Sequence, residues 1–419
     1  MRGSRRPPRT LVAVLTADVV STLGSEMTAV ALPWFVLVTT GSAARMAGVM
    51  AAEFAGIALL GLPAGRFAHL LGPRQALMVA DGVRAPLVAL IPALYWAGLL
   101  HYAVLLLIGL VVGGCFPAYA SGQRVLLAGV TGDDDVRLTR AGALLGGVNE
   151  TASFIGPAVG GGLIAWVGAP SVLVIDAVTY VVSFALVAAL VPAAPQVPDD
   201  EPTTSLTGLR FLRADRALRR QLVAVMVAGI GWTALMATLP VAARRRYHGG
   251  GQLAGALVAA YGGGSVLGAV AAARTKRVVG RPGLPLVAIA VAMAVAVVRL
   301  PSWGLAVAVA VFGVGNGIFF PRLFTALTLR PPPRLRTPVM ATAQVAMSVT
   351  SPVGFVAGGL LLEHASISAA FVLVAATATV AAVVSVTGQP LSTGVEVERG
   401  SSDEADQGEP GLLGELHRE

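Results

Sequence analysis

Residues 102–124 read YAVLLLIGLVVGGCFPAYASGQR, a stretch with no charged side chain before Arg124. A bilayer core of about 30 Å is crossed by a helix of about 20 apolar residues, so this stretch predicts a membrane-spanning helix. Comparable apolar blocks, separated by short polar breaks, recur along the whole chain. They predict further spans near residues 11–38, 45–66, 76–98, 141–167 and 171–193, and then near 221–243, 252–273, 283–300, 303–328, 338–362 and 366–387.

The overall composition leads to the same fold class. The 419 residues are 55% hydrophobic and only 12% charged, against about 25% charged in soluble domains. We therefore expect an all-α polytopic membrane protein with about twelve transmembrane helices in two pseudo-symmetric six-helix bundles. The net charge of +8 does not indicate nucleic-acid binding, because the arginines sit singly or in small groups at the ends of apolar blocks.

The motifs that would indicate enzymatic chemistry are absent from the sequence. The chain has no Gly-x-x-x-x-Gly-Lys-Ser/Thr loop, no His-Glu-x-x-His and no candidate nucleophile–base pair. Its one cysteine, Cys115, excludes an internal disulfide and a cysteine metal cluster. We expect no enzyme activity, no cofactor and no metal site, so active transport would have to draw on an ion gradient.

The spans divide the chain into five parts. These are a basic N-terminus (1–10), a six-helix bundle (11–193), a linker with a helix on the membrane surface (194–220), a second six-helix bundle (221–387) and a disordered acidic tail (388–419). Arginines concentrate in every second loop, which predicts cytoplasmic N- and C-termini. One lysine among many arginines, with abundant Ala, Gly and Val, is typical of a GC-rich bacterial genome, so we expect a multi-pass protein of the bacterial inner membrane.

The run Arg244–Arg245–Arg246 falls on the predicted outer side and conflicts with this orientation. It indicates either an external anionic site or a misplaced seventh span.

The two predicted bundles resemble each other in three places, in the same order. The loop at 65–72 resembles the loop at 273–280, Phe116-Pro117 matches Phe320-Pro321, and Gly160-Gly161-Gly162-Leu163 matches Ala357-Gly358-Gly359-Leu360. Parallel six-helix repeats about an axis along the membrane normal are one known transporter architecture.

On these residues the chain resembles the major facilitator superfamily over roughly residues 11–388. The loop from Gly65 to Leu77 is similar to the family signature Gly-x-x-x-Asp-x-x-Gly-Arg-Arg, with Gly72 in a tight turn and Arg74 at the inner interface. His69 stands at the position of the family's aspartate, and Pro73 replaces an arginine. In the family that aspartate belongs to a cytoplasmic latch between the halves, so the resemblance implies an altered latch here.

A second motif, Gly156-Pro157-Ala158-Val159-Gly160-Gly161, is similar to a signature of antiporter-type exporters. Proline bends a helix and glycines allow close helix packing, so the motif is also compatible with a merely structural packing seam. Together with Phe116-Pro117-Ala118 and Asp176, it makes the chain look most like the branch that includes siderophore and macrolide exporters.

Ionisable residues inside spans are costly, and they mark candidate functional positions. The candidates for substrate or proton coupling are Asp18, Glu26, Glu53 and Glu150, because desolvation favours the neutral form of a carboxyl and could let it exchange a proton. Asp81 and Arg84 form an expected intrahelical pair. Together with Arg124 and Asp18, they also fit a purely structural network near the inner face. Trp34 and Trp232 are candidates for a cavity wall.

These features predict a proton-coupled exporter of small apolar or amphipathic molecules (a drug, macrolide or siderophore-like compound) that works as a monomer by alternating access. The expected partners are a small-molecule substrate, protons and the lipid bilayer. An importer or uniporter of a polar nutrient is an alternative, as is a transport-inactive membrane receptor or regulator. The altered latch and the scarcity of acids in the second half keep the last alternative open.

Overall fold

The computed structural model describes residues 9–131, 135–192, 205–274, 283–332 and 335–386, without some side chains inside the helices of these ranges. Within these ranges the protein is all helical. The N-terminal half contains α1 (Arg9–Thr40), α2 (Ala43–Leu71), α3 (Pro73–Trp96), α4 (Tyr102–Thr131), α5 (Asp135–Val167) and α6 (Ala169–Leu190). The rest contains α7 (Ser205–Ala214), α8 (Arg216–Val241), η1 (Ala242–Arg246), α9 (Gly251–Arg274), α11 (Leu284–Val297), α12 (Ser302–Leu329), α13 (Arg336–His364) and α14 (Ile367–Val386).

The helices confirm the expected membrane fold. Each of the twelve predicted spans falls on one of them, and within the described ranges ten helices are long and apolar enough to cross a bilayer. Shorter apolar segments occupy Thr151–Val167 of α5 and Leu284–Val297. The short helix α7 ends at Ala214. The carboxylate of the next residue, Asp215, accepts hydrogen bonds from the backbone N–H groups of Ala217 and Leu218 and so caps the start of α8.

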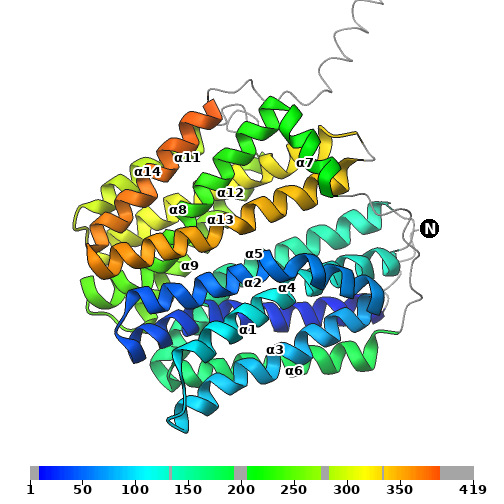
Figure 1. Ribbon diagram of the computed structural model, residues 1–419, viewed down its shortest axis with the longest axis horizontal. Coiled ribbons are helices and arrows are strands. Elements are labelled where there is room, and N and C mark those ends of the chain that lie inside the picture. Colours follow the sequence, from blue (N-terminus) through cyan, green and yellow to red (C-terminus); the bar gives the residue numbers. More distant parts are fainter. Residues whose placement is uncertain (1–8, 132–134, 193–204, 275–282, 333–334, 387–419) are drawn as a thin grey trace, which may run out of the picture.

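The two halves repeat one packing scheme and stand side by side; in Figure 1 the N-terminal half runs from blue (α1) to green (α6), and the C-terminal half continues from green to orange. In the N-terminal half α1 packs on α5 and α6, α2 on α4, and α3 on α4 and α6. The C-terminal half has the same pairs, since α8 packs on α13 and α14, α9 on α12, and α11 on α12 and α14. The halves join through α2 with α13 and through α5 with α9, which are also equivalent pairs.

Glycine contacts set the register of this repeat. A Cβ at Gly156 would collide with Glu26 of α1, and a Cβ at Gly354 would collide with Thr233 of α8. One turn further, Gly160 lies against Met27 and Gly358 against Ala234. Gly160 is therefore equivalent to Gly358, one residue away from the register that the sequence motifs suggested. Such glycines let helix backbones approach closely in a membrane bundle.

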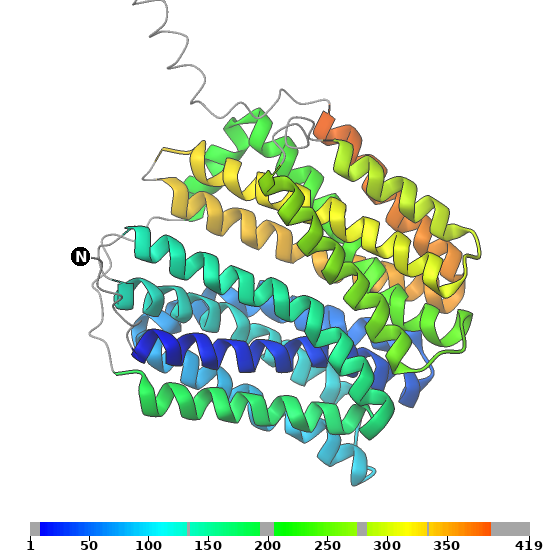
Figure 2. The ribbon, with the colours of Figure 1, turned by 180° about the vertical axis from the view of Figure 1, so that it is seen from behind.

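The halves are in contact at one end of the bundle and apart at the other. A Cβ at Gly161 would lie 2.8 Å from Gly255 Cα of α9. Gly147 lies on the same face of α5, about four turns earlier, and a Cβ there would meet no atom within 4 Å. The ribbons diverge in the same direction, toward the end that carries the N-terminus (Figure 2).

Candidate functional site

A chain of aromatic rings joins the two halves near the middle of the bundle. Phe54 of α2 contacts Phe355 of α13, with ring centroids 5.3 Å apart, and Trp232 of α8 at 6.1 Å. Trp232 then contacts Tyr261 of α9 at 6.3 Å, and Tyr261 contacts Phe312 of α12 at 6.0 Å. We call these five residues the aromatic chain. The aromatic chain therefore presents mostly apolar ring surface where the two halves touch.

Two of the four predicted coupling carboxyls lie close to this junction. Glu53 directly precedes Phe54 in α2, and its backbone lies against Gly113 of α4. Glu26 of α1 accepts a hydrogen bond of 2.7 Å at Oε1 from the Ser153 hydroxyl of α5. The two carboxyls are close enough to interact electrostatically. The third candidate, Glu150, belongs to α5, but its side chain lies outside the described residues.

A second group of charges is buried inside the N-terminal half, around Arg84. The predicted pair is present, with Arg84 Nη2 3.0 Å from Asp81 Oδ1. The rings of Tyr119 and Tyr180 lie on the guanidinium, each centroid 4.7 Å from its Cζ. Rings at this distance stabilise a buried cation through their π-electrons.

The carboxyls of Asp18 and Asp176 extend this group along α1 and α6. Asp176 Oδ2 accepts a hydrogen bond of 2.6 Å from the Thr28 hydroxyl. Asp18 accepts one of 3.4 Å from Thr22 and lies beside Gln123. We call Asp18, Asp81, Arg84 and Asp176, together with the two tyrosines, the buried charge column. Asp18 and Glu26 therefore belong to different surroundings, although both are on α1.

The residues of the two family motifs, together with Arg124, are predicted to control conformation. They lie in different parts of the bundle. Gly72 has φ +86° and precedes α3, as the predicted tight turn requires. Arg74 Nη2 donates a hydrogen bond of 2.7 Å to Ala188 O in the last turn of α6, within its own half. The side chain of Arg124 and the surroundings of Gly65 lie outside the described residues. The carbonyl oxygen of Pro157 lies against Gly255, so the second motif forms part of the seam between α5 and α9.

The arginine run has a role that the sequence did not resolve. The predicted seventh span falls on α8, which ends at Val241, and Arg244–Arg246 follow in η1. Arg244 Nη1 donates to Leu37 O of α1 at 2.7 Å, and Arg246 Nη1 donates to Ala296 O of α11 at 3.2 Å. Both acceptors are in the last turns of their helices, where backbone carbonyls lack helical partners and the helix dipole favours a cation.

The central arginine of the run bridges the halves. Arg245 donates to Leu362 O of α13 at 3.0 Å and to Gly41 O, between α1 and α2, at 2.8 Å. Its Nη2 lies 3.6 Å from Glu363 Oε2, which accepts a hydrogen bond of 2.9 Å from the Ala43 N–H at the start of α2. We call Arg244, Arg245 and Glu363 the arginine clasp. Sequence reasoning missed Glu363, and its only signal was an acid near the end of a span.

The second predicted cavity tryptophan has a different position from Trp232. Trp34 is buried in the main apolar core of the protein, 9% exposed. Sequence reasoning also missed Phe54, Phe355, Tyr261 and Phe312, because single aromatic residues inside apolar spans do not show which way they point.

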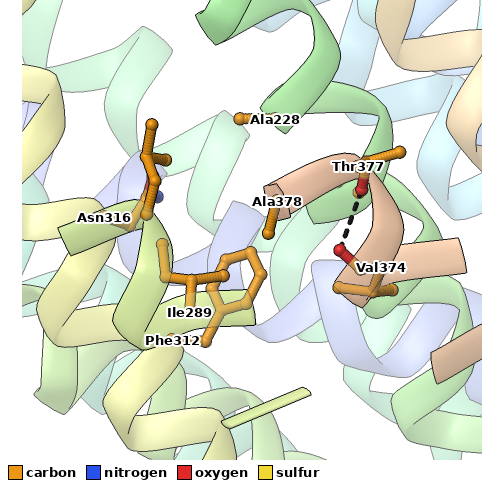
Figure 3. A pocket seen from close by; sticks show the side chains of 9 residues that line it. Ala228, Ile289, Phe312, Asn316, Val374, Thr377 and Ala378 are labelled. Atoms are coloured by element: carbon orange, nitrogen blue, oxygen red, sulfur yellow. Dashed lines mark hydrogen bonds between the residues drawn. The ribbon is translucent and has the colours of Figure 1, made fainter. Parts of the chain in front are cut away.

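A small pocket lies within the C-terminal half, between α8, α11, α12 and α14 (Figure 3). Ile289, Phe312, Val374 and Ala378 give it a largely apolar wall. Asn316 also lines it and donates a hydrogen bond of 2.6 Å to the hydroxyl of Tyr261. The four helices are equivalent to α1, α3, α4 and α6, so this pocket is the counterpart of the buried charge column.

Two six-helix repeats that meet at a mid-bundle junction define a transporter of the major facilitator superfamily. Within it, the chain belongs to the transmembrane secretion effector family, whose model matches residues 8–410. It is similar to the multidrug efflux pump Tap of Mycobacterium tuberculosis (strain ATCC 25618 / H37Rv), with 28% identity over 52% of this chain and 54% of that protein. The match thus spans about half the length of that relative. Tap of Mycolicibacterium fortuitum is 26% identical over 88% of this chain and 93% of that protein.

Solved structures share the fold at low sequence identity. A D-xylose–proton symporter matches with a TM-score of 0.70 and 11% identity, over 92% of this chain and 99% of the symporter. A bacterial homologue of the human lysosomal transporter Spinster, in an inward-facing and unoccupied conformation, matches with a TM-score of 0.66 and 13% identity, over 97% of this chain and all of that one. At such identities the likeness establishes the fold alone.

Proposed function

We propose that the protein is a proton-coupled exporter of small apolar or amphipathic molecules that works by alternating access. The aromatic chain carries this proposal, because it presents large apolar rings where the halves meet. Polar sugar or nucleoside sites need several hydrogen-bonding side chains to fix their substrates, and the aromatic chain contributes only the Tyr261 hydroxyl and the Trp232 indole N–H. The similarity to Tap multidrug efflux pumps supports the same direction of transport.

Glu26 and Glu53 supply the proposed link between substrate and protons. Glu53 is adjacent to Phe54 of the aromatic chain, and Glu26 accepts a hydrogen bond from Ser153 of α5, a helix that packs on α9 of the other half. A carboxyl that meets water only when the junction opens can exchange its proton with alternate sides of the membrane. We further propose that the N-terminus is cytoplasmic, so that the bundle opens to the cytoplasm and the arginine clasp closes the outer side.

The test is a sensitivity screen of drugs and metabolites in an efflux-deficient bacterial host, with and without the gene. A compound whose toxicity the gene lowers is then studied with purified protein in liposomes, where an imposed pH gradient should drive its movement. Accumulation of a polar nutrient in intact cells, without resistance to any compound, would contradict the export proposal and favour an importer.

A further inference from the structure

The buried charge column contains more negative than positive charge. Its carboxyls are Asp18, Asp81 and Asp176, and Arg84 is its one cation among the side chains that the structure describes; none of the four is more than 5% exposed. Burying a carboxylate without a partner is very costly, so such groups take up a cation or a proton. The column therefore has room for further positive charge.

Several polar atoms of the column and of its neighbours lack a hydrogen-bond partner among the described residues. They are Asp18 Oδ2, Asp81 Oδ2, the Tyr119 hydroxyl, the Ser183 hydroxyl and Gln123 Nε2. Ser183 of α6 lies beside both Asp81 and Tyr119, and Gln123 of α4 lies beside Asp18, without completing a hydrogen bond. Buried polar atoms are normally paired, so these oxygens face a site that is incomplete without a proton or water.

The repeat provides an internal control for the role of these charges. Gly24 lies against Asp176 and Thr179, and Gly231 lies against Thr377 and Val374 in the other half. Val374 and Ala378 therefore hold the positions of Asp176 and Tyr180. The same helix arrangement is built there around the apolar pocket of Figure 3. Since the fold packs without charges in one half, packing alone does not explain their presence in the other.

Different helices form the buried charge column and the aromatic chain, which is the proposed substrate path. Its residues come from α1, α3, α4 and α6, whereas the aromatic chain comes from α2, α8, α9, α12 and α13. Glu53 of α2 connects the two, because it interacts electrostatically with both Asp176 and Arg84.

We propose that Asp18 and Asp81 form a proton-binding site inside the N-terminal half, behind the substrate path. The proton bonds to a carboxylate oxygen, and the neighbouring hydroxyls and the Gln123 amide orient the resulting acid. The ionisable groups that face this site are Arg84 on α3, Tyr119 and Cys115 on α4, and Asp176 and Tyr180 on α6. Arg84 forms an ion pair with Asp81, and its positive charge would repel a metal cation at this site. A proton therefore suits the site better than Na⁺ does.

This proposal rests on the proposed function, because it adds a second proton-binding site to Glu26 and Glu53 of the same transporter. The test measures charge displacement in liposomes that contain the full-length protein, adsorbed on a solid-supported membrane, after a pH jump without substrate. The unmodified protein should give a transient current. Asp18→Asn and Asp81→Asn should each lower its amplitude, and the variant with both substitutions should keep only the part that Glu26 and Glu53 contribute.

Several variants guard against a loss of folding. Asp18→Asn leaves the Asp81–Arg84 pair intact, and Asp81→Asn combined with Arg84→Gln removes both partners of that pair. Tyr119→Phe keeps the ring on Arg84 and should move only the midpoint pH of the current. Thr377→Val alters the equivalent place in the C-terminal half and should leave the current unchanged.

The outcomes separate this site from the export proposal. A full pH-jump current in the folded double variant would overturn the site, and so would a current that follows a Na⁺ jump and not a pH jump. Ethidium efflux driven by a pH gradient tests export independently. Loss of that efflux in Trp232→Ala with a normal pH-jump current would show that the proton site works apart from the substrate path.

Discussion

Arg245 Nη2 donates a hydrogen bond of 2.8 Å to Gly41 O, and this bond joins the C-terminal half to the connection between α1 and α2 of the other half. Arg244 makes a second bond across the same boundary, to Leu37 O. Opening this end of the bundle requires both bonds to break, so the clasp sets how strongly the present conformation is favoured.

Weakening the clasp should shift the protein toward the conformation that is open at this end. A hydrogen bond to a charged group contributes about 1.5–3 kcal/mol, so Arg244→Ala with Arg245→Ala should change the ratio of conformations by about tenfold or more. Ala47 of α2 is fully buried against Gly359 of α13. The reactivity of a cysteine placed there, in a Cys115→Ser background, toward a membrane-impermeant maleimide measures the shift.

Arg246→Ala is the matched control for the clasp, because Arg246 bonds to Ala296 within its own half. It should leave the reactivity at Ala47 unchanged. Equal reactivity in both variants would mean that the clasp does not govern opening.

A side chain at Gly161 should keep the halves from closing. A Cβ there would lie 2.8 Å from Gly255 Cα, whereas a Cβ at the adjacent Gly162 would meet nothing within 4 Å. Gly161→Leu should therefore abolish transport with normal amounts of protein in the membrane, and Gly162→Leu should retain it. Growth on a toxic substrate of the pump, with protein levels from immunoblots, measures both; similar activity of the two variants would rule out the seam as a moving contact.

Neutral replacements of the junction carboxyls should uncouple transport from the pH gradient. Glu53→Gln and Glu26→Gln keep shape and hydrogen bonding but cannot release a proton. We expect a loss of gradient-driven efflux in liposomes with substrate binding retained, measured by fluorescence quenching of a bound dye. Ser153→Ala removes the hydrogen bond to Glu26 and should weaken coupling less than Glu26→Gln does. Undiminished pH-driven efflux in both glutamine variants would remove these residues from the mechanism.

Substitution of Trp232 should change which compounds are exported. Its ring touches both Phe54 and Tyr261, so Trp232→Ala breaks the aromatic chain between the halves. Resistance to bulky apolar compounds should fall more than resistance to small ones. Trp303 is 72% exposed near the start of α12, and Trp303→Ala should leave the resistance profile unaltered. A uniform decrease for all compounds would indicate a stability effect instead.

Arg74 should act on stability and not on gating. It donates to Ala188 O at the end of α6 in its own half, and a cation at such a site contributes about 0.3–1 kcal/mol. Arg74→Ala should lower the thermal unfolding temperature in detergent by about one degree or less, while the cysteine reactivity at Ala47 stays constant. A changed reactivity at Ala47 would show that Arg74 affects the opening of the bundle.

Much of the fold could be predicted from the sequence, because a span needs only length and apolar composition, and both are local properties. The twelve spans and the Asp81–Arg84 pair, three residues apart on one helix, are of this kind. The site depends on which face of each helix points into the protein. A helix that is apolar on every face gives no sign of this in its sequence. That is why Phe54, Glu363 and the partners of Arg244 emerged only from the three-dimensional packing.

The clasp recognises backbone more than side chains. Arg244 and Arg245 donate to carbonyl oxygens, and Glu363 accepts a hydrogen bond from a backbone N–H. Every residue has a backbone carbonyl, so Leu37 and Leu362 can be substituted while these hydrogen bonds remain. In relatives, substitutions of these arginines should therefore not correlate with substitutions of the residues whose carbonyls they bind. Methods that infer contacts from correlated substitutions would miss the arginine clasp.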